Sequence, residues 1–345
     1  MNLFRNTSFS LLLAAACLPA HATLLTNGDF SGGTGGTIIA GSATGTVTVP
    51  TGWSGFATGD NGLQVLGDQT KFNAGNRPPI NYIQQSVTTT PGRWLQLTWD
   101  QTTGQFADRT SIASSFWNGS DTSGAADYSH QFHWTGARQT LFRATGSTTT
   151  LRMSDEGSNT TSSDVNLDNV VLDLANGLIN IAPAVGTPTV SSSFGGSTTG
   201  WGNPNNAIDG GVANSSFTVF HGNNASGGDF YQLDFSEGFT LERIEIASRT
   251  AANNDRIGTQ LEILDENGNP ITTIPIVSGA LFGVDGFWSN AHGVRVTDAD
   301  SHLNIGELRT FARFTDGVQT FAVPEPSTLA LLGAGLALLR FRRRR

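Results

Sequence analysis

The sequence predicts an all-β protein, with two β-sandwiches in tandem between an N-terminal signal peptide and a short C-terminal hydrophobic helix. Apolar and polar residues alternate with a period of two in many short runs, which is typical of half-buried antiparallel strands. Turn-forming residues separate these runs: the chain has 42 glycines, and charged residues make up only 14% of it. The body contains no stretch of useful length with helical periodicity. These observations favour packed β-sheets over a helical or mixed fold.

The first 22 residues carry the parts of a secretory signal peptide in their usual order. Arg5 supplies a positive charge, residues 9–18 form an apolar core, and Ala20-His21-Ala22 forms an A-x-A cleavage site. We expect cleavage after Ala22 and export of the mature chain. A buried N-terminal helix, or a lipoprotein attached through Cys17, agrees less well with these features.

Residues 23–174 are expected to form the first sandwich. Six alternating runs bounded by Gly, Asn, Ser or Pro predict its strands: 82–87, 93–99, 130–134, 140–145, 149–154 and 165–172. The looser segment 175–186, which contains Pro183, is interpreted as a linker.

Residues 187–316 are expected to form the second sandwich. Its strands are predicted at 230–235, 241–249, 259–276, 292–298 and 305–314. Asn267-Gly268 inside the third run predicts a hairpin turn, because both residues tolerate positive φ. A calcium loop at the same place is disfavoured, since its glycine is out of position and its closing glutamate is missing.

The C-terminal segment 323–345 combines a Pro-Glu-Pro motif, a short apolar stretch and five arginines. The uncharged residues 328–339 would make a helix about 18 Å long, well short of the roughly 30 Å hydrocarbon core of a bilayer. Arginines at its end favour retention on the cytoplasmic side. The length argues against an ordinary permanent membrane anchor.

This tail resembles the PEP-CTERM sorting signal, with Pro324, Glu325 and Pro326 as its motif. The resemblance implies a Gram-negative bacterium and transient anchoring in the inner membrane. It further implies processing by an exosortase-type membrane protease, and release to the cell surface or an extracellular polysaccharide matrix.

The composition limits the partners and the chemistry of the exported body. The only cysteine, Cys17, lies in the signal peptide, so the mature chain has neither disulfide nor thiol chemistry. Without Arg5 and the five tail arginines, the 19 basic residues fall to 13, against 28 acidic residues. This acidic balance argues against nucleic acid and anionic lipid as partners, and is compatible with neutral sugars and calcium.

The first half resembles the galactose-binding-like jelly rolls of carbohydrate-binding modules. The resemblance lies in "LLTNGDFSGG" at its start, an early "VPTGWSG" and a closing "VNLDNVVL". In that family the first and last strands often share a structural calcium, which implies Asp29 and Asp168 as ligands here. The alternative is that Asp29 caps a turn and Asp168 points to solvent.

The second half resembles the discoidin domain, the coagulation factor five/eight C-type domain, across five ordered blocks between residues 187 and 314. Among them are "NPNNAIDGG", "FYQLDF" and "NIGELRTF". The resemblance implies another galactose-binding-like jelly roll, often lectin-like in bacteria. It also implies a calcium loop with Asp209 and Glu307, and Asn214 where the family often has threonine. The alternative is that Asp209-Gly210 is only a tight turn.

Sugars are bound by aromatic faces and by side chains that satisfy hydroxyls. We expect such groups in the second domain on loops at one end of the sandwich. The candidates are Trp201, His221, Arg249, Arg256 and Trp288. Each of them also has a structural interpretation, either as a core aromatic residue or as a solvated strand end.

No catalytic motif stands out in the sequence. It lacks G-x-S-x-G, H-E-x-x-H and the phosphate-binding glycine motifs. His130 and His133 would lie on opposite faces of a strand, which disfavours a shared zinc. The sequence therefore predicts a non-enzymatic exported protein that binds carbohydrate or exopolysaccharide. The alternatives are an adhesive matrix protein that binds other proteins, and a polysaccharide hydrolase with an unrecognised site.

Overall fold

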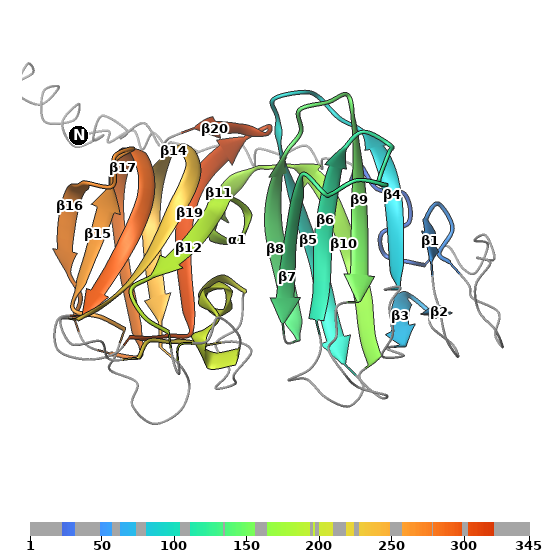
Figure 1. Cartoon of the computed structure of the whole chain (residues 1–345). Coiled ribbons are helices and arrows are strands. Elements are labelled where there is room, and N and C mark those ends of the chain that lie inside the picture. Colours follow the sequence, from blue (N-terminus) through green and yellow to red (C-terminus); the bar gives the residue numbers. More distant parts are fainter. Residues whose placement is uncertain are drawn as a thin grey trace, which may run out of the picture.

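The computed structural model contains two β-sandwiches that lie side by side (Figure 1). It describes residues 23–31, 49–56, 63–73, 81–103, 111–133, 135–155, 164–193, 196, 200–209, 219–223, 228–248, 257–277, 279–298 and 303–320. The predicted signal peptide and sorting tail lie outside these residues. Within this set, no helix is long and apolar enough to cross a membrane.

The first domain is built from two five-stranded antiparallel sheets, as the sequence predicts for a jelly roll. One sheet has the order β1 (Ser54–Phe56), β4 (Tyr82–Thr88), β9 (Thr148–Asp155), β6 (Ser111–Asn118) and β7 (Tyr128–His133). The other has the order β2 (Leu63–Leu66), β3 (Gln69–Asn73), β10 (Asp164–Leu174), β5 (Trp94–Thr103) and β8 (Gly136–Arg143). Strands β7 and β8 are thus the edge strands on the side that faces the second domain (Figure 1).

Period-2 alternation places the apolar residues of both sheets in one core. In β4 every second side chain is buried, among them Ile83 and Val87. Aromatic rings fill the space between the sheets: Phe116 stacks on Phe142 at 4.7 Å, and Trp99 meets Phe132 edge-on at 4.8 Å. Rings of this size account for much of the apolar area that a sandwich buries.

Within the described residues, the second domain contains one eight-stranded sheet, a two-stranded ladder and three short helices. Its elements are β11 (Gly177–Asn180), α1 (Ala182–Val185), β12 (Gly186–Val190), η3 (Gly200–Gly202), η4 (Pro204–Ile208), β13 (Phe220–His221), β14 (Asp229–Ala247), β15 (Gln260–Leu264), β16 (Pro270–Pro275), β17 (Leu281–Asp298), β18 (Asn304–Ile305), β19 (Glu307–Thr315) and β20 (Val318–Thr320). The main path of the sheet is β11-β19-β14-β17-β15-β16, with β12 on β14 and β20 on β19. Gly268 (φ 77°) forms the turn of the β15–β16 hairpin, as the sequence predicts.

The long strands β14 and β17 bend together and so produce a sandwich from one sheet. A straight strand of 19 residues would measure about 60 Å, more than the width of a domain of this length. The register of the pair shifts between Asp234 and Phe239 and again between Phe239 and Leu241, where Asn290 of β17 takes a positive φ of 54°. Before the bend β14 pairs with β12, and after it β14 pairs with β19. The two halves therefore face each other across the second core.

The predicted linker 175–186 is part of the second domain. Strand β11 pairs with β19 from Gly177↔Phe314 to Asn180↔Phe311, and α1 buries Ala182, Pro183 and Val185. The prediction of a linker was therefore wrong over 177–185. Proline at the start of α1 is compatible with a helix, because its missing N–H would be unsatisfied there in any case.

The two domains share an apolar seam centred on Trp94 of β5. Its ring meets Phe239 at 5.7 Å and Phe314 at 5.9 Å, both edge-on and both from the second domain. Trp94 and Leu141 belong to the core cluster of the second domain rather than to that of their own. The seam is therefore a continuation of a hydrophobic core.

Polar contacts surround this apolar seam. Trp94 N donates to Gly317 O, Gly317 N to Ala175 O, and Ala175 N to Trp94 O, at 2.8, 2.8 and 2.9 Å. The Tyr128 hydroxyl donates to Pro183 O at 2.9 Å, and Arg143 forms an ion pair with Glu237 at 2.7 Å. Both charged side chains are substantially exposed, so this ion pair contributes at most about 1 kcal/mol. The ring of backbone bonds and the aromatic packing hold the seam together.

Trp94→Ala is expected to destabilise the protein by about 3–5 kcal/mol, because a buried ring and its edge contacts are lost at the seam. Differential scanning calorimetry should also show one cooperative transition separating into two. Phe287→Ala is the control, because that ring is 50% exposed and its removal should change stability by less than about 1 kcal/mol. A Trp94→Ala variant that melts like the wild type would contradict this account of the seam.

Candidate functional site at the loop end of the second domain

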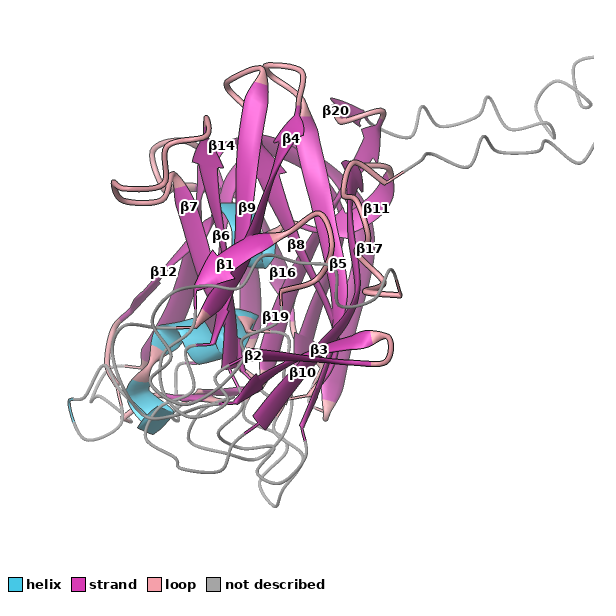
Figure 2. Cartoon of the chain, turned by 90° about the vertical axis from the view of Figure 1, so that its right-hand side faces the viewer, coloured by secondary structure: helices cyan, strands magenta, loops and turns pink. Residues whose placement is uncertain are grey.

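The candidate site lies at the end of the second sandwich where η3, η4, the β13–β18 ladder and the start of β19 meet. The ladder pairs Phe220 with Ile305 and His221 with Asn304. Glu307 pairs with Ala247, so the end of β14 reaches the same place. Figure 2 shows the short helices of this region together at one end of the molecule.

Polar side chains are buried beneath this end of the sandwich. Asn206, Asp209, Asn304 and Glu307 are each no more than 2% exposed. Buried carboxylates and amides are destabilising unless other groups compensate for the lost water. At this end of the fold, polar side chains therefore occupy buried positions where apolar side chains would stabilise the protein more.

Local structure explains how Asp209 reaches the interior. Asn203 caps η4 by accepting a hydrogen bond from the backbone N–H of Asn205 at 3.1 Å, and Pro204 follows at the first helical position. Asn206 donates from Nδ2 to Val219 O at 3.1 Å, which ties the helix to the strand region behind it. Asp209 then follows the last residue of η4.

Asp209 and Glu307 face a common interior region. Burial raises the pKa of the Tyr231 hydroxyl well above its usual range, and the charges of Glu307 and Asp209 raise it further. The Tyr231 hydroxyl donates to Pro204 O at 3.0 Å, so the ring lies against η4. Both carboxylates therefore lie within electrostatic range of the same buried phenol.

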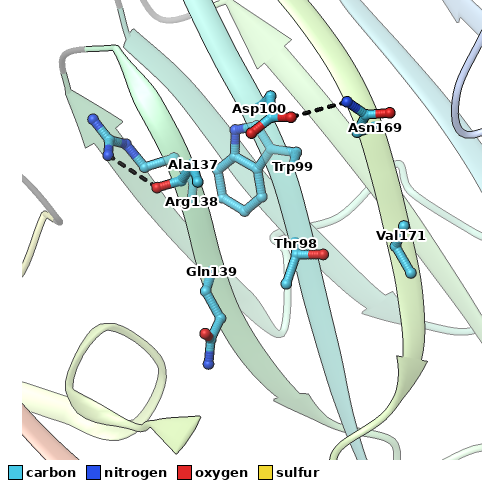
Figure 3. Close-up of a pocket in the computed structure, with 8 residues that line it drawn as sticks. All are labelled: Thr98, Trp99, Asp100, Ala137, Arg138, Gln139, Asn169 and Val171. Atoms are coloured by element: carbon cyan, nitrogen blue, oxygen red, sulfur yellow. Dashed lines mark hydrogen bonds between the residues drawn. The ribbon is translucent and has the colours of Figure 1, made fainter.

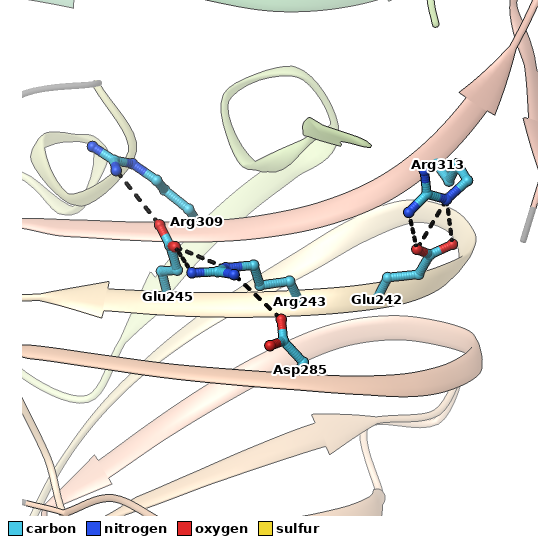
Figure 4. Close-up of polar contacts among 6 residues, drawn as sticks. All are labelled: Glu242, Arg243, Glu245, Asp285, Arg309 and Arg313. Atoms are coloured by element: carbon cyan, nitrogen blue, oxygen red, sulfur yellow. Dashed lines mark hydrogen bonds and ion pairs between the residues drawn. The ribbon is translucent and has the colours of Figure 1, made fainter. Parts of the chain in front are cut away.

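Arginines from both domains surround this acidic pair. Arg309 Nε lies 3.8 Å from Glu307 Oε1, and its Nη1 lies 3.5 Å from Glu245 Oε2. Figure 4 shows how Arg309 and Arg243 join β19, β14 and β17 through Glu245 and Asp285. Burial lowers the pKa of Arg138 in the first domain, and the charges of Asp209 and Glu307 partly offset this effect.

Oxygen donors at this end fit a hard cation better than a transition metal. Among the described residues no three His, Cys, Asp or Glu side chains gather into a metal-binding group. Asn304 lies in the β13–β18 ladder at the same end of the sandwich, is fully buried, and has a side chain that makes no hydrogen bond within the described part of the chain. Carboxylate, amide and backbone oxygens are the ligands that calcium prefers.

The predicted sugar-binding residues divide into three groups. Trp201 in η3 and His221 in β13 lie at the loop end, and both are partly exposed. His221 Nδ1 lies 2.6 Å from Gly222 O, which fixes the orientation of the ring. Arg249, Arg256 and the predicted calcium ligand Asn214 lie outside the described residues, as does the motif Pro324-Glu325-Pro326.

Trp288 lies away from the other candidates. It pairs with Leu241, six residues along β14 from Ala247 at the loop end, which is a separation of about 20 Å. Its indole packs over Gly286 and against the hydrophobic core. The structure therefore does not bring Trp288 together with His221, because β17 runs the length of the sandwich between them.

In the first domain, the predicted pair Asp29 and Asp168 lies in an acidic cluster. Burial raises the pKa of Asp168 most, followed by the charges of Asp68, Asp100 and Asp29; a hydrogen bond from Asn169 N opposes them. Asp29 accepts hydrogen bonds from Ser31 N and Ser31 Oγ at 3.3 and 2.9 Å, as a turn-capping residue does. The two segments meet where Val170 N donates to Gly28 O at 2.9 Å.

A shallow cavity of about 420 Å³ lies on the same sheet of the first domain (Figure 3). Asn169, in the left-handed region at φ 50°, donates from Nδ2 to Asp100 Oδ2 at 2.9 Å across its rim. Trp99 lines it but is only 2% exposed, so it offers little aromatic face for stacking. Trp53 and Trp117 are also buried, at 4% and 7%.

Comparison with known proteins bears mainly on the tail. The body is a tandem β-sandwich protein. Residues 322–345 match the family model described as the PEP-CTERM protein-sorting motif, which confirms the motif expected there from the sequence. A sorting motif at this position implies export and sorting to the cell envelope. No curated protein sequence matches the chain.

Similar solved structures are carbohydrate-binding and discoidin-type domains. A fucose-binding module of Streptococcus pneumoniae is 24% identical, over 39% of this chain and 94% of its own, with a TM-score of 0.34. The fucolectin of striped bass, Morone saxatilis, is 17% identical over 72% and 87%, with a TM-score of 0.34. A factor five/eight type C domain of Bacteroides fragilis is 12% identical over 38% and 93%, with a TM-score of 0.30. At these scores the likenesses alone assign neither a mechanism nor a ligand to this chain.

Sequence reasoning missed Asn304 as a member of the site. It stands in the segment "DADSHLNIGEL", where the polar residues suggest a solvated loop. A signal was present: Asn304 lies between Leu303 and Ile305, both fully buried, and three residues before Glu307. Only the pairing with β13 shows that this segment turns inward.

In calcium-free protein, Asp168→Asn is expected to increase stability at neutral pH and to have little effect at pH 3. A carboxylate whose folded pKa is raised loses its favourable contribution as pH rises through that pKa, from about pH 4 upward. The amide is uncharged throughout and still accepts the hydrogen bond from Asn169 N. Urea titrations at pH 3 to 7 measure the difference.

Asp173→Asn is the matched control. Asp173 Oδ1 also accepts a hydrogen bond from the next backbone N–H, that of Leu174, at 2.7 Å, but its charge is not among those that raise the pKa of Asp168. An Asp168→Asn variant that loses stability at pH 7 without calcium would contradict this prediction, whereas a loss seen only with added calcium would indicate that Asp168 binds the ion.

Proposed function

We propose that this chain is an exported, non-enzymatic protein that binds neutral carbohydrate at the loop end of its second sandwich. The observation that carries the proposal is the arrangement there: an oriented imidazole and a partly exposed indole lie at the same end of the sandwich as a group of buried acids and amides. Side chains that are held from beneath are pre-organised, which lowers the entropic penalty of binding a flexible ligand.

His221 and Trp201 supply the two devices that sugar recognition needs. The contact between Nδ1 and Gly222 O holds the ring of His221 in place, and an imidazole can exchange hydrogen bonds with sugar hydroxyls. The indole of Trp201 supplies an apolar face for C–H groups of a pyranose. Arg249 and Arg256 follow the end of β14 in sequence, and we propose that they complete the site as donors to ring hydroxyls.

Calcium is proposed as the cation that neutralises the acidic pair. Asp209 and Glu307 would hold it through carboxylate oxygens, with Asn304, Asn214 and backbone carbonyls as further donors. A bound divalent ion would fix the segments that carry Trp201 and His221, in a domain without disulfides. Asp29 and Asp168 remain a second predicted calcium site, at the start and end of the first domain.

A binding role is favoured over hydrolysis by the burial of the acids. Asp209 and Glu307 are about 1% exposed, and Asp229 and Asp298, paired across β14 and β17, are no more than 6% exposed. A glycosidase needs two carboxylates that reach the scissile bond from both sides. Carboxylates beneath the surface orient other residues without touching a polymer.

The sorting motif supplies the destination in this proposal. After export, the tail would hold the protein transiently in the inner membrane until an exosortase-type protease processes it. The protein would then reach the cell surface or the extracellular matrix of a Gram-negative bacterium, where exopolysaccharide is abundant.

A second candidate function is adhesion to other proteins, which an exposed apolar edge favours. Ile271 of the edge strand β16 is 47% exposed, and Val277, just after this strand, is 75% exposed. Exposed apolar side chains on an edge strand are a common basis for protein contacts. Crosslinking on cells that captured only proteins, and through this edge, would favour this alternative.

His221→Ala is expected to weaken binding of a recognised monosaccharide by at least about tenfold, which corresponds to about 1.4 kcal/mol. A glycan array containing fucose- and galactose-terminated glycans identifies the ligand, and isothermal titration calorimetry measures the affinity. Trp288→Ala is the control: it should lower stability and leave affinity unchanged, because that ring lies about 20 Å away. Absence of binding to every glycan on the array would refute the proposed function.

Calcium is expected to stabilise chelator-treated protein by about 2.7 kcal/mol when its concentration is 100 times its dissociation constant. The melting temperature should rise accordingly. Asp209→Asn and Glu307→Gln should each abolish this increase, measured against the calcium-free melting temperature of the same variant. Asp285→Asn, at a carboxylate that is 78% exposed, should retain it. Retention of the full increase in both buried variants would place calcium elsewhere.

A further inference from the structure

Two cavities lie along the seam between the domains and join into one groove. One has a volume of about 670 Å³ and the other about 390 Å³, and Ser129, His130 and Asn205 line both of them. Cavities of several hundred Å³ at a domain boundary are typical places for ligands. Together these two are long enough for more than one sugar ring.

The groove has one wall from each domain. Strand β7, the edge strand of its sheet, supplies Ser129, His130 and Gln131. Opposite, η4 supplies Asn203 and Asn205 to the smaller cavity, while α1 and the start of β12 line the larger one. Neither domain alone would form it.

The seam gives the groove a defined shape before any ligand arrives. The Tyr128 hydroxyl bridges the walls: it lies 2.6 Å from Thr140 Oγ1 and donates to Pro183 O. Trp94 lies at the floor of the larger cavity and is packed against Phe239 and Phe314. Rigid walls reduce the entropy that a ligand must lose on binding.

The chemistry of the groove is that of neutral saccharides. Its walls carry hydroxyl, amide and imidazole groups, which both donate and accept hydrogen bonds as sugar hydroxyls do. The wall that α1 and β12 supply to the larger cavity also carries apolar residues, namely Pro183, Val185 and Pro188. Of the charged groups at its rim, Arg143 is already paired with Glu237 at 2.7 Å. A polyanion would meet few positive charges here and an acidic body around them.

We propose that this groove is a second binding site, for internal residues of an extended neutral oligosaccharide. The proposed loop-end site would take a terminal residue, and the groove would take the chain that follows it. The two are linked through the short helices: Asn203 lines the groove, and Trp201 stands two residues before it in η3. This inference takes its ligand class from the proposed function, but places the contact on different residues.

A polypeptide strand added to the edge of β7 is the competing occupant. Such a strand needs a long free row of backbone groups. On this side of the sheet, α1 already contacts both β7 and β8, and Pro183 accepts the Tyr128 hydroxyl. The groups that are left to contact a ligand are side-chain amides and hydroxyls from both walls. They suit a saccharide better than the backbone of an added polypeptide strand.

The test uses Asn205, because it is exposed and lines both cavities. Asn205→Ala removes an amide, and Asn205→Trp fills the junction. Galactose and β-1,4-linked galacto-oligosaccharides of two to six units, together with fucose, serve as probes in isothermal titration calorimetry. Asn267→Ala and Asn267→Trp are matched controls, at an exposed asparagine of the distant β15–β16 hairpin.

Affinity of the wild type is expected to rise at least tenfold from the monosaccharide to the hexasaccharide. Asn205→Trp should abolish this rise, Asn205→Ala should reduce it severalfold, and both should bind the monosaccharide like the wild type. The Asn267 variants should behave like the wild type throughout.

Each other outcome has a distinct meaning. Monosaccharide binding that depends on His221 but never strengthens with chain length would overturn the groove and leave the proposed function standing. Absence of binding to every probe would count against both. Binding of an extended ten-residue alanine–serine peptide that Asn205→Trp abolishes, without such an effect on saccharides, would overturn the saccharide assignment in favour of a polypeptide.

Discussion

The insertion of Trp94 into the core of the neighbouring domain is the contact on which the arrangement of the molecule depends. One ring from β5 lies between Phe239 and Phe314, and three backbone hydrogen bonds close around it. Because the seam is apolar and contiguous with a core, we expect the two domains to keep a fixed relative orientation rather than to move independently. The cavities beside the seam exist for the same reason.

The second domain retains charge where a sandwich of its size gains most from apolar packing. Asp209 and Glu307 are buried among Tyr231, Arg309 and Arg138, and so depend on compensation from several elements and from both domains. Burial of this kind contributes little to stability, and in other proteins it is often retained for specificity. Here it lies directly beneath the segments that carry Trp201 and His221.

Local patterning was enough to predict the all-β class and many of the strands, although β1, β2, β3 and β6 of the first domain were not predicted. The alternation in residues 82–87 and 149–154 corresponds to β4 and β9, and Asn267-Gly268 forms the expected hairpin turn. Strand β11 was missed because its four residues show no alternation and its partner β19 lies about 130 residues further along the chain. Long-range pairing of a short edge strand leaves no periodic signal.

The candidate site was less predictable than the fold, because it depends on which segments meet. Placing Trp288 beside His221 overlooked the length of β17, which carries the indole away from the loops. Asn304 was hidden in a polar segment whose inward turn is set by pairing with β13. Ser129 and Asn205 are ordinary surface residues in sequence and become neighbours only through the packing of Trp94.

The position of β20 determines which way the molecule would face while it is tethered. Thr320, the last described residue, pairs with Arg313, which is six residues or about 20 Å along β19 from Glu307. Figure 1 shows β20 at the upper end of the domain, opposite the short helices and their loops. A protein held by the segment after residue 320 would therefore have the loops around η3, η4 and β13 at the end that points away from the lipid surface.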